Sequence, residues 1–260
     1  AYGIIMSGFY LPVIIMLLAL VFRGVAFEYR WVAKPNHAFW DIAFAGGSIT
    51  AALMQGIILG GLLHGLPVEN GHFAGGMLDW LQPFPLFVGL ATVAGYALLG
   101  TTWLVMRTEG EVAAEARQQA RSLLLVVLAA MAVVSLWTPL SEARIWDRWF
   151  TLPNFFYLAP IPLLTGLAAF TVWRGLENGH DRSPFFGTVA LFLLGFAGLA
   201  ISTLPYLVPP TITIWDSAAH PSSQLFMLIG TAALLPMILG YTAFVYWTFR
   251  GKVKPGEGYH

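Results

Sequence analysis

The sequence has no cysteine, and only 10% of its 260 residues are charged, against about 25% in an ordinary soluble domain. Without cysteine the chain forms no disulfide, thiolate metal site or cysteine nucleophile. Acidic and basic residues number 13 each and no basic tail or stripe occurs, so nucleic acid is not expected as a partner. HExxH, Walker and other short metal- or phosphate-binding motifs are absent too. We therefore predict no catalytic residue and no metal site in this chain alone.

What the sequence does have is a series of seven long apolar stretches, and 58% of its residues are hydrophobic. The stretches cover residues 4–31, 38–63, 84–106, 118–140, 155–173, 184–207 and 222–249. Each is near or above the ~20 residues that a helix needs to cross a bilayer. None alternates as barrel strands do, and helices satisfy their own backbone hydrogen bonds in lipid. We predict an all-α polytopic membrane helix bundle, with seven transmembrane helices in one integral-membrane domain over residues 1–260.

Basic residues are distributed unevenly between the two sides of this bundle. If alternate connections share a side, one side holds ten of them: Arg30, Lys34, Arg107, Arg117, Arg121, Arg174, Arg182, Arg250, Lys252 and Lys254. The other side holds only Arg144 and Arg148, and Arg23 lies inside the first stretch. By the positive-inside rule the ten-residue side, and with it the C-terminus, faces the cytoplasm.

The histidines do not form a haem site in this pattern. They are His37, His64, His72, His180, His220 and His260. Each lies at a predicted helix end, in a loop or at the terminus, whereas a buried b-type haem needs axial ligands inside the bundle. We therefore expect that this chain does not supply both ligands of a haem.

Ionisable and polar residues within the apolar stretches are the candidates for function. Arg23 and Glu28 lie five residues apart in the first stretch and would form an acid and a base at a proton entrance. The alternative is that Arg23 extends to lipid headgroups and Glu28 is solvated. Asp41 falls in the first turn of the second predicted helix, where a carboxylate is favoured by the helix dipole. Gln55, in the middle of that helix, needs a polar partner, which is either a neighbouring helix or a quinone or water chain.

Two further patterns concern the packing and length of helices. Ala52, Gly56 and Gly60 recur at a spacing of four and allow close approach of another helix. The charged segment 107–122 carries its charges at helical spacings, so it is expected to extend a helix beyond the membrane.

Several segments, taken together, give the chain a family resemblance. FRGVAFEYR (Phe22 to Arg30) resembles a signature of subunit II of the cytochrome bd quinol oxidases. The similarity continues, in order, through FWDIAFAGGS, QPFPLFVGL, TTWLVMRTEGEV, LPYLVPP, TIWDSAAHPSSQL and YTAFVYWTFRGKV. The stretch from Gly46 to Gly56 is most similar to the cyanide-insensitive branch of this family.

The resemblance implies a haem-free membrane subunit of a quinol-oxidising, oxygen-reducing terminal oxidase in the bacterial inner membrane. Its expected partners are membrane lipid, a small single-helix subunit and subunit I, which carries the b and d haems and the quinol-oxidising loop. Some members of the family hold a structural quinone in subunit II. The subunit is expected to support assembly and to line a cytoplasmic proton route. By position, Arg23 and Glu28 match the family's Arg and acidic residue on this route, and Asp41 and Gln55 are candidate quinone or structural polar contacts.

One departure from the family concerns length. Members have about nine helices, and this chain aligns with the last seven. It is therefore expected to be a C-terminal fragment without the two helices that carry an Asp-Gly-Phe-Asp-like motif and a Trp-Asp motif. On this expectation it would not contain the whole proton path.

Two other classes of protein are alternatives to an oxidase subunit. A secondary transporter or other polytopic permease usually has broken helices and polar sites at the membrane midplane, and midplane polar residues are few here. A dihaem cytochrome requires deep histidines, which the pattern lacks.

Overall fold

The chain forms an elongated helical bundle. The computed structural model describes residues 1–32 and 37–253, so Lys34, Lys254 and His260 lie outside the described residues. Its long helices are α1 (Tyr2–Val32), α2 (His37–His64), α3 (Pro83–Arg107), α4 (Gly110–Ser141), α7 (Pro160–Glu177), α8 (Ser183–Thr203) and α9 (Pro221–Thr248). Seven spans in the described residues are long and apolar enough to cross a membrane. The predicted fold class and the seven spans are confirmed.

Short elements connect the long helices at one end of the bundle. They are α5 (Ala143–Phe150), α6 (Asn154–Leu158) and two antiparallel hairpins, β1 (Val68–Glu69) with β2 (His72–Phe73) and β3 (Tyr206–Val208) with β4 (Ile212–Thr213). Helix α8 ends at Thr203, four residues before its predicted end at residue 207, because Leu204 is extended and precedes Pro205. Helix α4 begins at Gly110, so the charged segment after it is helical, as predicted.

The small residues of α2 lie where two other helices approach it. A Cβ atom on Gly56 would lie 2.7 Å from the Cα of Gly89 on α3. One on Gly47 would lie 2.6 Å from the carbonyl oxygen of Ala19 on α1. A larger side chain at either position would push the helices apart, so the glycines set the spacing of α1, α2 and α3.

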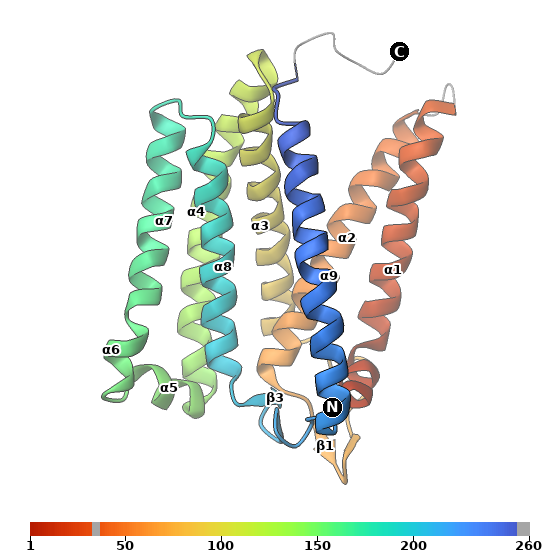
Figure 1. Ribbon diagram of the computed structural model, residues 1–260, viewed down its shortest axis with the longest axis vertical. Helices are drawn as coiled ribbons and strands as arrows, with labels where there is room; N and C mark the ends of the chain where they lie inside the picture. The colour runs from red at the N-terminus through yellow and green to blue at the C-terminus, as the bar shows by residue number, and fades with distance from the viewer. Residues whose placement is uncertain (33–36, 254–260) are drawn as a thin grey trace.

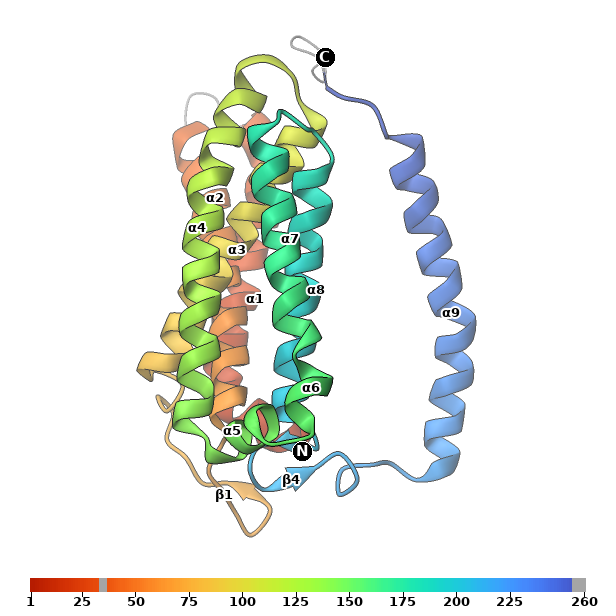
Figure 2. The same ribbon diagram turned by 90° about the vertical axis from the view of Figure 1, so that its left-hand side faces the viewer.

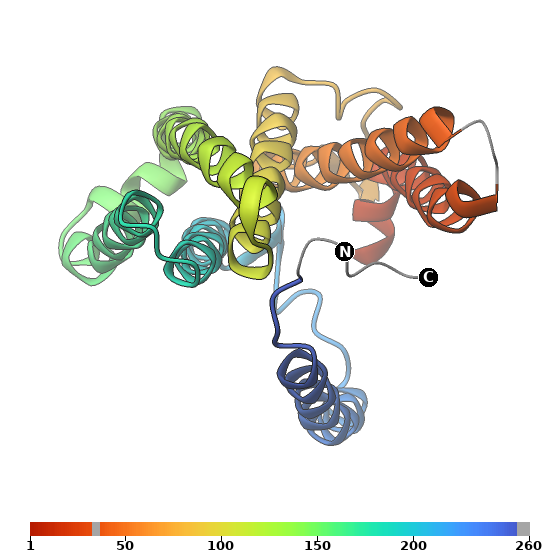
Figure 3. The same cartoon turned by 90° about the horizontal axis from the view of Figure 1, so that it is seen from above.

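Helices α3, α4, α7 and α8 form a second group (Figure 3), and a hydrophobic cluster lies between them. Its fully buried side chains include Leu98 of α3, Leu124 of α4, and Val172 and Leu176 of α7. Helix α3 belongs to both groups and joins the α1–α2 pair to the rest.

Helix α9 stands away from all the others (Figures 2 and 3). None of its residues is buried, although the helix is strongly apolar. It is held at its C-terminal end, where the rings of Tyr246 and Trp103 lie 5.9 Å apart and the N–H of Val253 donates to the carbonyl of Arg107 at 2.8 Å.

The two ends of the bundle differ in charge. One end, called the basic end below, contains the C-terminal end of α1, the N-terminal end of α2, the α3–α4 and α7–α8 connections and residues 249–253 (Figure 1). The opposite end contains the N-terminus, both hairpins, α5 and α6. Of the basic residues in the described loops and helix ends, only Arg144 and Arg148 lie at the opposite end. The structure therefore reproduces the alternation seen in the sequence.

Candidate functional site

A bidentate ion pair joins α1 and α2 at the basic end. Arg30 donates to the Asp41 carboxylate from Nε, at close range to Oδ1, and from Nη2, which lies 3.5 Å from Oδ2. The ring Nδ1 of His37 lies 2.8 Å from the carbonyl oxygen of Arg30, close enough to donate to it. The placement of Asp41 in the first turn of α2 is wrong: the helix begins at His37, and no acidic residue lies in its first turn. Its carboxylate instead joins α2 to the end of α1 through Arg30.

Arg23 lies deeper on α1, beside the close contact with α2. The backbone N of Arg23 would lie 3.2 Å from a Cβ atom on Gly47. Its guanidinium is 5.5 Å from the ring centroid of Phe44, which precedes Gly47 and so is closer to the basic end. The side chain thus runs along α2 toward that end while its stem stays in the apolar region, as arginine does near an interface.

Glu28 is exposed on the same helix. It lies about 7.5 Å from Arg23 along the helix axis, since each residue adds 1.5 Å. Within the described residues it forms no ion pair with Arg23 or any other cation. The structure therefore brings Arg30 and Asp41 together, but leaves Glu28 facing outward from the chain.

Gln55 has a partner on a neighbouring helix. The hydroxyl of Tyr96 on α3 donates to Gln55 Oε1 at 2.9 Å. The Tyr96 ring in turn stacks on Phe192 of α8, with 5.9 Å between centroids. This polar contact links α2 to α3 in the middle of the bundle, and of the two alternatives for Gln55 it corresponds to the neighbouring helix.

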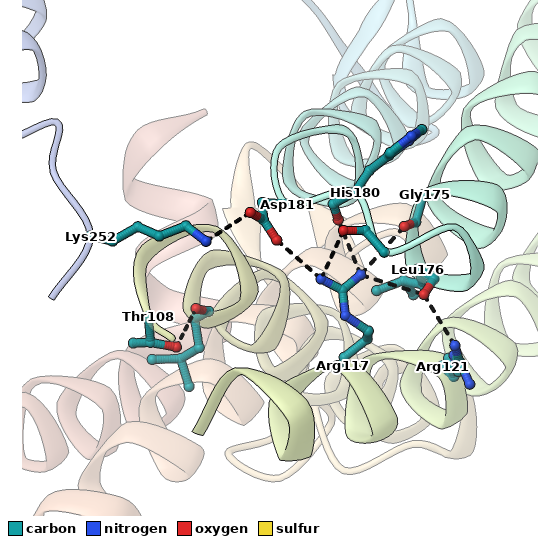
Figure 4. A network of polar contacts seen from close by, with 10 residues as sticks. Thr108, Arg117, Arg121, Gly175, Leu176, His180, Asp181 and Lys252 are labelled. Atoms are coloured by element: carbon teal, nitrogen blue, oxygen red, sulfur yellow. Dashed lines mark hydrogen bonds and ion pairs between the residues drawn. The ribbon is translucent and has the colours of Figure 1, made fainter. Parts of the chain in front are cut away.

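The richest polar network lies at the basic end and connects α4, the α7–α8 turn and the segment after α9 (Figure 4). Asp181 accepts from Lys252 Nζ at 2.7 Å and from Arg117 Nη2 at 3.2 Å. The hydrogen bond from Lys252, aided by the charges of Lys252 and Arg117, lowers the pKa of the Asp181 carboxyl below its usual value.

Arg117 also serves the end of α7. Its Nη1 donates to the carbonyl of His180 at 3.1 Å and more weakly to those of Gly175 and Leu176, both at 3.4 Å. Arg121, one turn further along α4, donates to Leu176 at 3.1 Å. Gly175 and Leu176 lie in the last turn of α7, where carbonyls have no donor within the helix, so two arginines of α4 cap α7.

Arg107 binds the chain beyond α9 in a similar way. Its guanidinium donates to the carbonyl oxygens of Gly251, at 3.0 Å, and Phe249. It lies 4.8 Å from the ring of Trp103. Together with Lys252, this arginine holds the otherwise detached α9 to the basic end.

The described histidines lie where the sequence pattern placed them. His37 and His64 are at opposite ends of α2, His72 is in β2, His180 is in the α7–α8 turn and His220 caps α9. No two of them face each other inside the bundle, and within residues 1–32 and 37–253 no three metal-binding side chains cluster. The described histidines therefore form no pair placed as two axial haem ligands would be.

Sequence reasoning missed Tyr96, the Arg30–Asp41 pair and the Asp181 network as contacts. Tyr96 lies 41 residues from Gln55 along the chain, and Arg30 lies 11 residues from Asp41. The partners of Asp181 are 64 and 71 residues away from it. Only Arg30 and Asp41 carried a signal, because both flank one short turn between two predicted helices.

These features define a class: a polytopic membrane subunit with an apolar bundle, a strongly polar basic end and one helix left uncovered. The family described as cytochrome bd terminal oxidase subunit II matches residues 1–249. The chain belongs to this family and is a membrane subunit of an oxidoreductase complex.

Individual relatives agree with this assignment. The chain is 28% identical to the cytochrome bd-I ubiquinol oxidase subunit 2 of Escherichia coli K12, over 97% of its own length and 76% of the relative's. It is 25% identical to the cytochrome bd ubiquinol oxidase subunit 2 of Bacillus subtilis 168, over 98% and 77%. Its fold matches a chain of the bd oxidase from Geobacillus thermodenitrificans with a TM-score of 0.74 and 16% identity, covering 93% of this chain and 74% of that one.

Proposed function

We propose that this chain is the haem-free membrane subunit of a quinol-oxidising, oxygen-reducing terminal oxidase. The observation that carries the proposal is the family match over residues 1–249, and the placement of the histidines at element ends supports it. The b and d haems then belong to the partner subunit I. The family match also favours this function over a permease or a dihaem cytochrome.

The complex is proposed to lie in the bacterial inner membrane with the basic end and the C-terminus in the cytoplasm. The charge difference between the two ends supports this orientation. The exposed apolar faces of α1 and α9 support a role in assembly, because such faces must be covered by lipid or by other helices of the complex. A small single-helix subunit is a further proposed partner on such a face.

Glu28 and Arg23 are proposed to border the cytoplasmic entrance of the proton route. Glu28 is an exposed carboxylate near the basic end of α1 that no cation of the described chain neutralises. A carboxylate of this kind can take up a proton from the cytoplasm and release it toward the partner subunit. Arg23 would supply a fixed positive charge that holds anions, including ionised Glu28, near the entrance.

Asp41 and Gln55 are proposed to have structural roles. Asp41 is engaged by Arg30, and Gln55 Oε1 is engaged by Tyr96. Both therefore fasten helices to each other, and we assign no quinone contact to either.

The test of the proton route is a Glu28→Gln variant in the whole oxidase complex. Glutamine keeps the size and hydrogen-bonding capacity of glutamate but cannot ionise. We expect steady-state oxygen reduction to slow by about tenfold or more, as when a proton-transfer group is removed, while the haem difference spectrum is unchanged. Glu115→Gln removes the same charge from the exposed surface of α4 and serves as the control.

Unchanged turnover of Glu28→Gln from acidic to alkaline pH would show that Glu28 is only a solvated charge. Arg23→Ala is expected to reduce turnover further and to lower the yield of assembled complex, measured as haem per protein.

A further inference from the structure

The two arginines of the opposite end lie together on one side of α5. Arg144 and Arg148 are four residues apart, so they are neighbours on the helix surface. They line an open cavity of about 480 Å³. Its other walls include Asp147 of α5, Asn154 and Tyr157 of α6, and Ile201 near the end of α8. A volume of this size is typical of a site for a small ligand.

Arg148 is fixed by the protein itself. Its Nη1 donates to the carbonyl of Ile201 at 3.1 Å. The neighbouring Trp149 donates from Nε1 to Ser202 Oγ at 2.9 Å. These two hydrogen bonds attach α5 to the end of α8 and hold the guanidinium of Arg148 at the wall of the cavity.

The guanidinium of Arg144 has no comparable hydrogen bond. Its guanidinium lies 5.0 Å from the ring centroid of Tyr206, yet its Nε and Nη1 atoms are buried and have no hydrogen-bond partner. Asp147 is close in sequence, but within the described residues it forms no ion pair with either arginine. Unsatisfied buried donors of a charged group are costly. Neither arginine at the cavity is neutralised by a carboxylate of the described residues, so their positive charge is left for an acceptor from outside the chain.

An anion is the acceptor that matches the charge of this site. The two arginines and the single carboxylate of Asp147 leave a net charge of one positive at the cavity. The paired N–H groups of a guanidinium fork match the geometry of phosphate oxygens. Asn154 and Tyr157 add an amide and a phenol, which can donate further hydrogen bonds. Leu152 and Phe156 follow and precede the lining residues Thr151 and Tyr157 in the sequence, and they are 73% and 69% exposed. They offer an acyl chain an apolar surface next to the charged pocket.

We propose that this cavity binds a phosphate oxyanion, with Arg144 and Arg148 as its cationic ligands. Helix α5 lies across the end of the bundle (Figure 1), and its Trp146 and Phe150 side chains are exposed. Aromatic residues of this kind are typical of the membrane interface, so the proposed site lies at headgroup depth. The headgroup of an anionic phospholipid and free phosphate share the required chemistry. The site is at the other end of the bundle from the proposed proton route and does not depend on it.

The test uses the complete oxidase complex, purified and stripped of lipid in detergent. Phosphatidylglycerol and the neutral phosphatidylcholine are added back separately and bound lipid is counted by native mass spectrometry. Binding of inorganic phosphate is measured by titration calorimetry. Arg144→Gln is compared with Arg182→Gln, which removes one exposed positive charge at the basic end. Arg144→Lys retains the charge but not the fork, and the haem difference spectrum reports on assembly of each variant.

We expect wild type and Arg182→Gln to bind phosphatidylglycerol but not phosphatidylcholine, and Arg144→Gln to bind it at least about tenfold more weakly, which corresponds to the loss of one charged hydrogen bond. Arg144→Lys should fall between them. Arg144-dependent binding of inorganic phosphate without phosphatidylglycerol would support the same site with a free anion as its ligand. If neither ligand binds, or if Arg144→Gln and Arg182→Gln bind equally well, the proposal is overturned.

Discussion

The arginines at the two ends of the bundle differ in how completely their guanidinium groups are hydrogen-bonded. At the basic end, Arg117 and Arg107 donate to backbone carbonyls of other segments, and Arg117 also reaches Asp181. At the opposite end, Arg144 leaves two buried guanidinium nitrogens without a partner. One carboxylate at this end is held by neutral groups: Asp216 Oδ2 accepts from the hydroxyl of Thr213 at 2.6 Å and from its N–H at 3.0 Å, which lowers the pKa of the Asp216 carboxyl.

The difference separates structural arginines from an arginine available for binding. The basic end has the many positive charges that the positive-inside rule expects on the cytoplasmic side. Several of these residues also cap helices and hold α9. The opposite end has two arginines where that rule favours few. Retaining a poorly paired guanidinium in this place is explained most simply by an anion that the chain does not itself contain.

The largest expected effect is on stability at the basic end. Arg117→Ala removes donors to Asp181 and to the carbonyls at the end of α7, and leaves those acceptors partly buried. We expect a loss of about 2 kcal/mol, typical of hydrogen bonds to charged groups, seen as a lower melting temperature of the complex in detergent. Arg182→Ala should change it little. Equal melting temperatures for the two variants would mean that the network does not stabilise the bundle.

A smaller effect is expected for Asp181→Asn. The pKa of Asp181 is lowered in the folded chain, so its contribution is present at pH values above its unfolded pKa of about 3.9 and is lost as the pH falls through the folded value. The side chain is 41% exposed, so solvent limits the contribution to below about 1 kcal/mol.

The measurement is the melting temperature of wild type and Asp181→Asn at neutral pH and at successively lower pH. The gap between them should close under acid conditions. A double-mutant cycle with Lys252→Met should show that most of the effect is shared between the two residues. A gap that widens as the pH falls would contradict the sign of the pKa shift.

The smallest effect on stability is expected for Arg144. In lipid-stripped complex, Arg144→Gln removes an unsatisfied buried charge but also its contact with Tyr206, so the two changes nearly cancel, to within about 1 kcal/mol. Addition of phosphatidylglycerol should raise the melting temperature of wild type and not that of the variant. A large destabilisation of the stripped variant would show that Arg144, like Arg117, is a structural residue.

The spans could be predicted from the sequence because they depend on local composition and length. The alternation of basic residues and the stripe from Ala52 to Gly60 are equally local, and both agree with the structure. Helix α8 was predicted too long, since the apolar residues from Leu204 to Leu207 continue the hydropathy after the backbone has left the helix.

The polar contacts could be predicted only in kind. A polar residue inside a span needs a partner, so a contact for Gln55 was expected, but Tyr96 could not be identified without the packing of α2 on α3. Asp41 was placed by helix position, whereas Arg30, 11 residues earlier, determines its contact. The cavity at Arg144 combines α5, α6 and α8, and no local pattern connects these segments.

The proposed proton route depends on the orientation of the two ends in the membrane. This orientation can be measured directly because the chain has no cysteine of its own. Glu69→Cys places a thiol in the β1–β2 hairpin of the opposite end, and Glu111→Cys places one in the first turn of α4 at the basic end. Spheroplasts of cells that produce the complex are treated with a membrane-impermeant maleimide. We predict that Glu69→Cys is labelled in spheroplasts and Glu111→Cys only after permeabilisation. The reverse pattern would place the basic end and Glu28 outside the cytoplasm and contradict the proposed function.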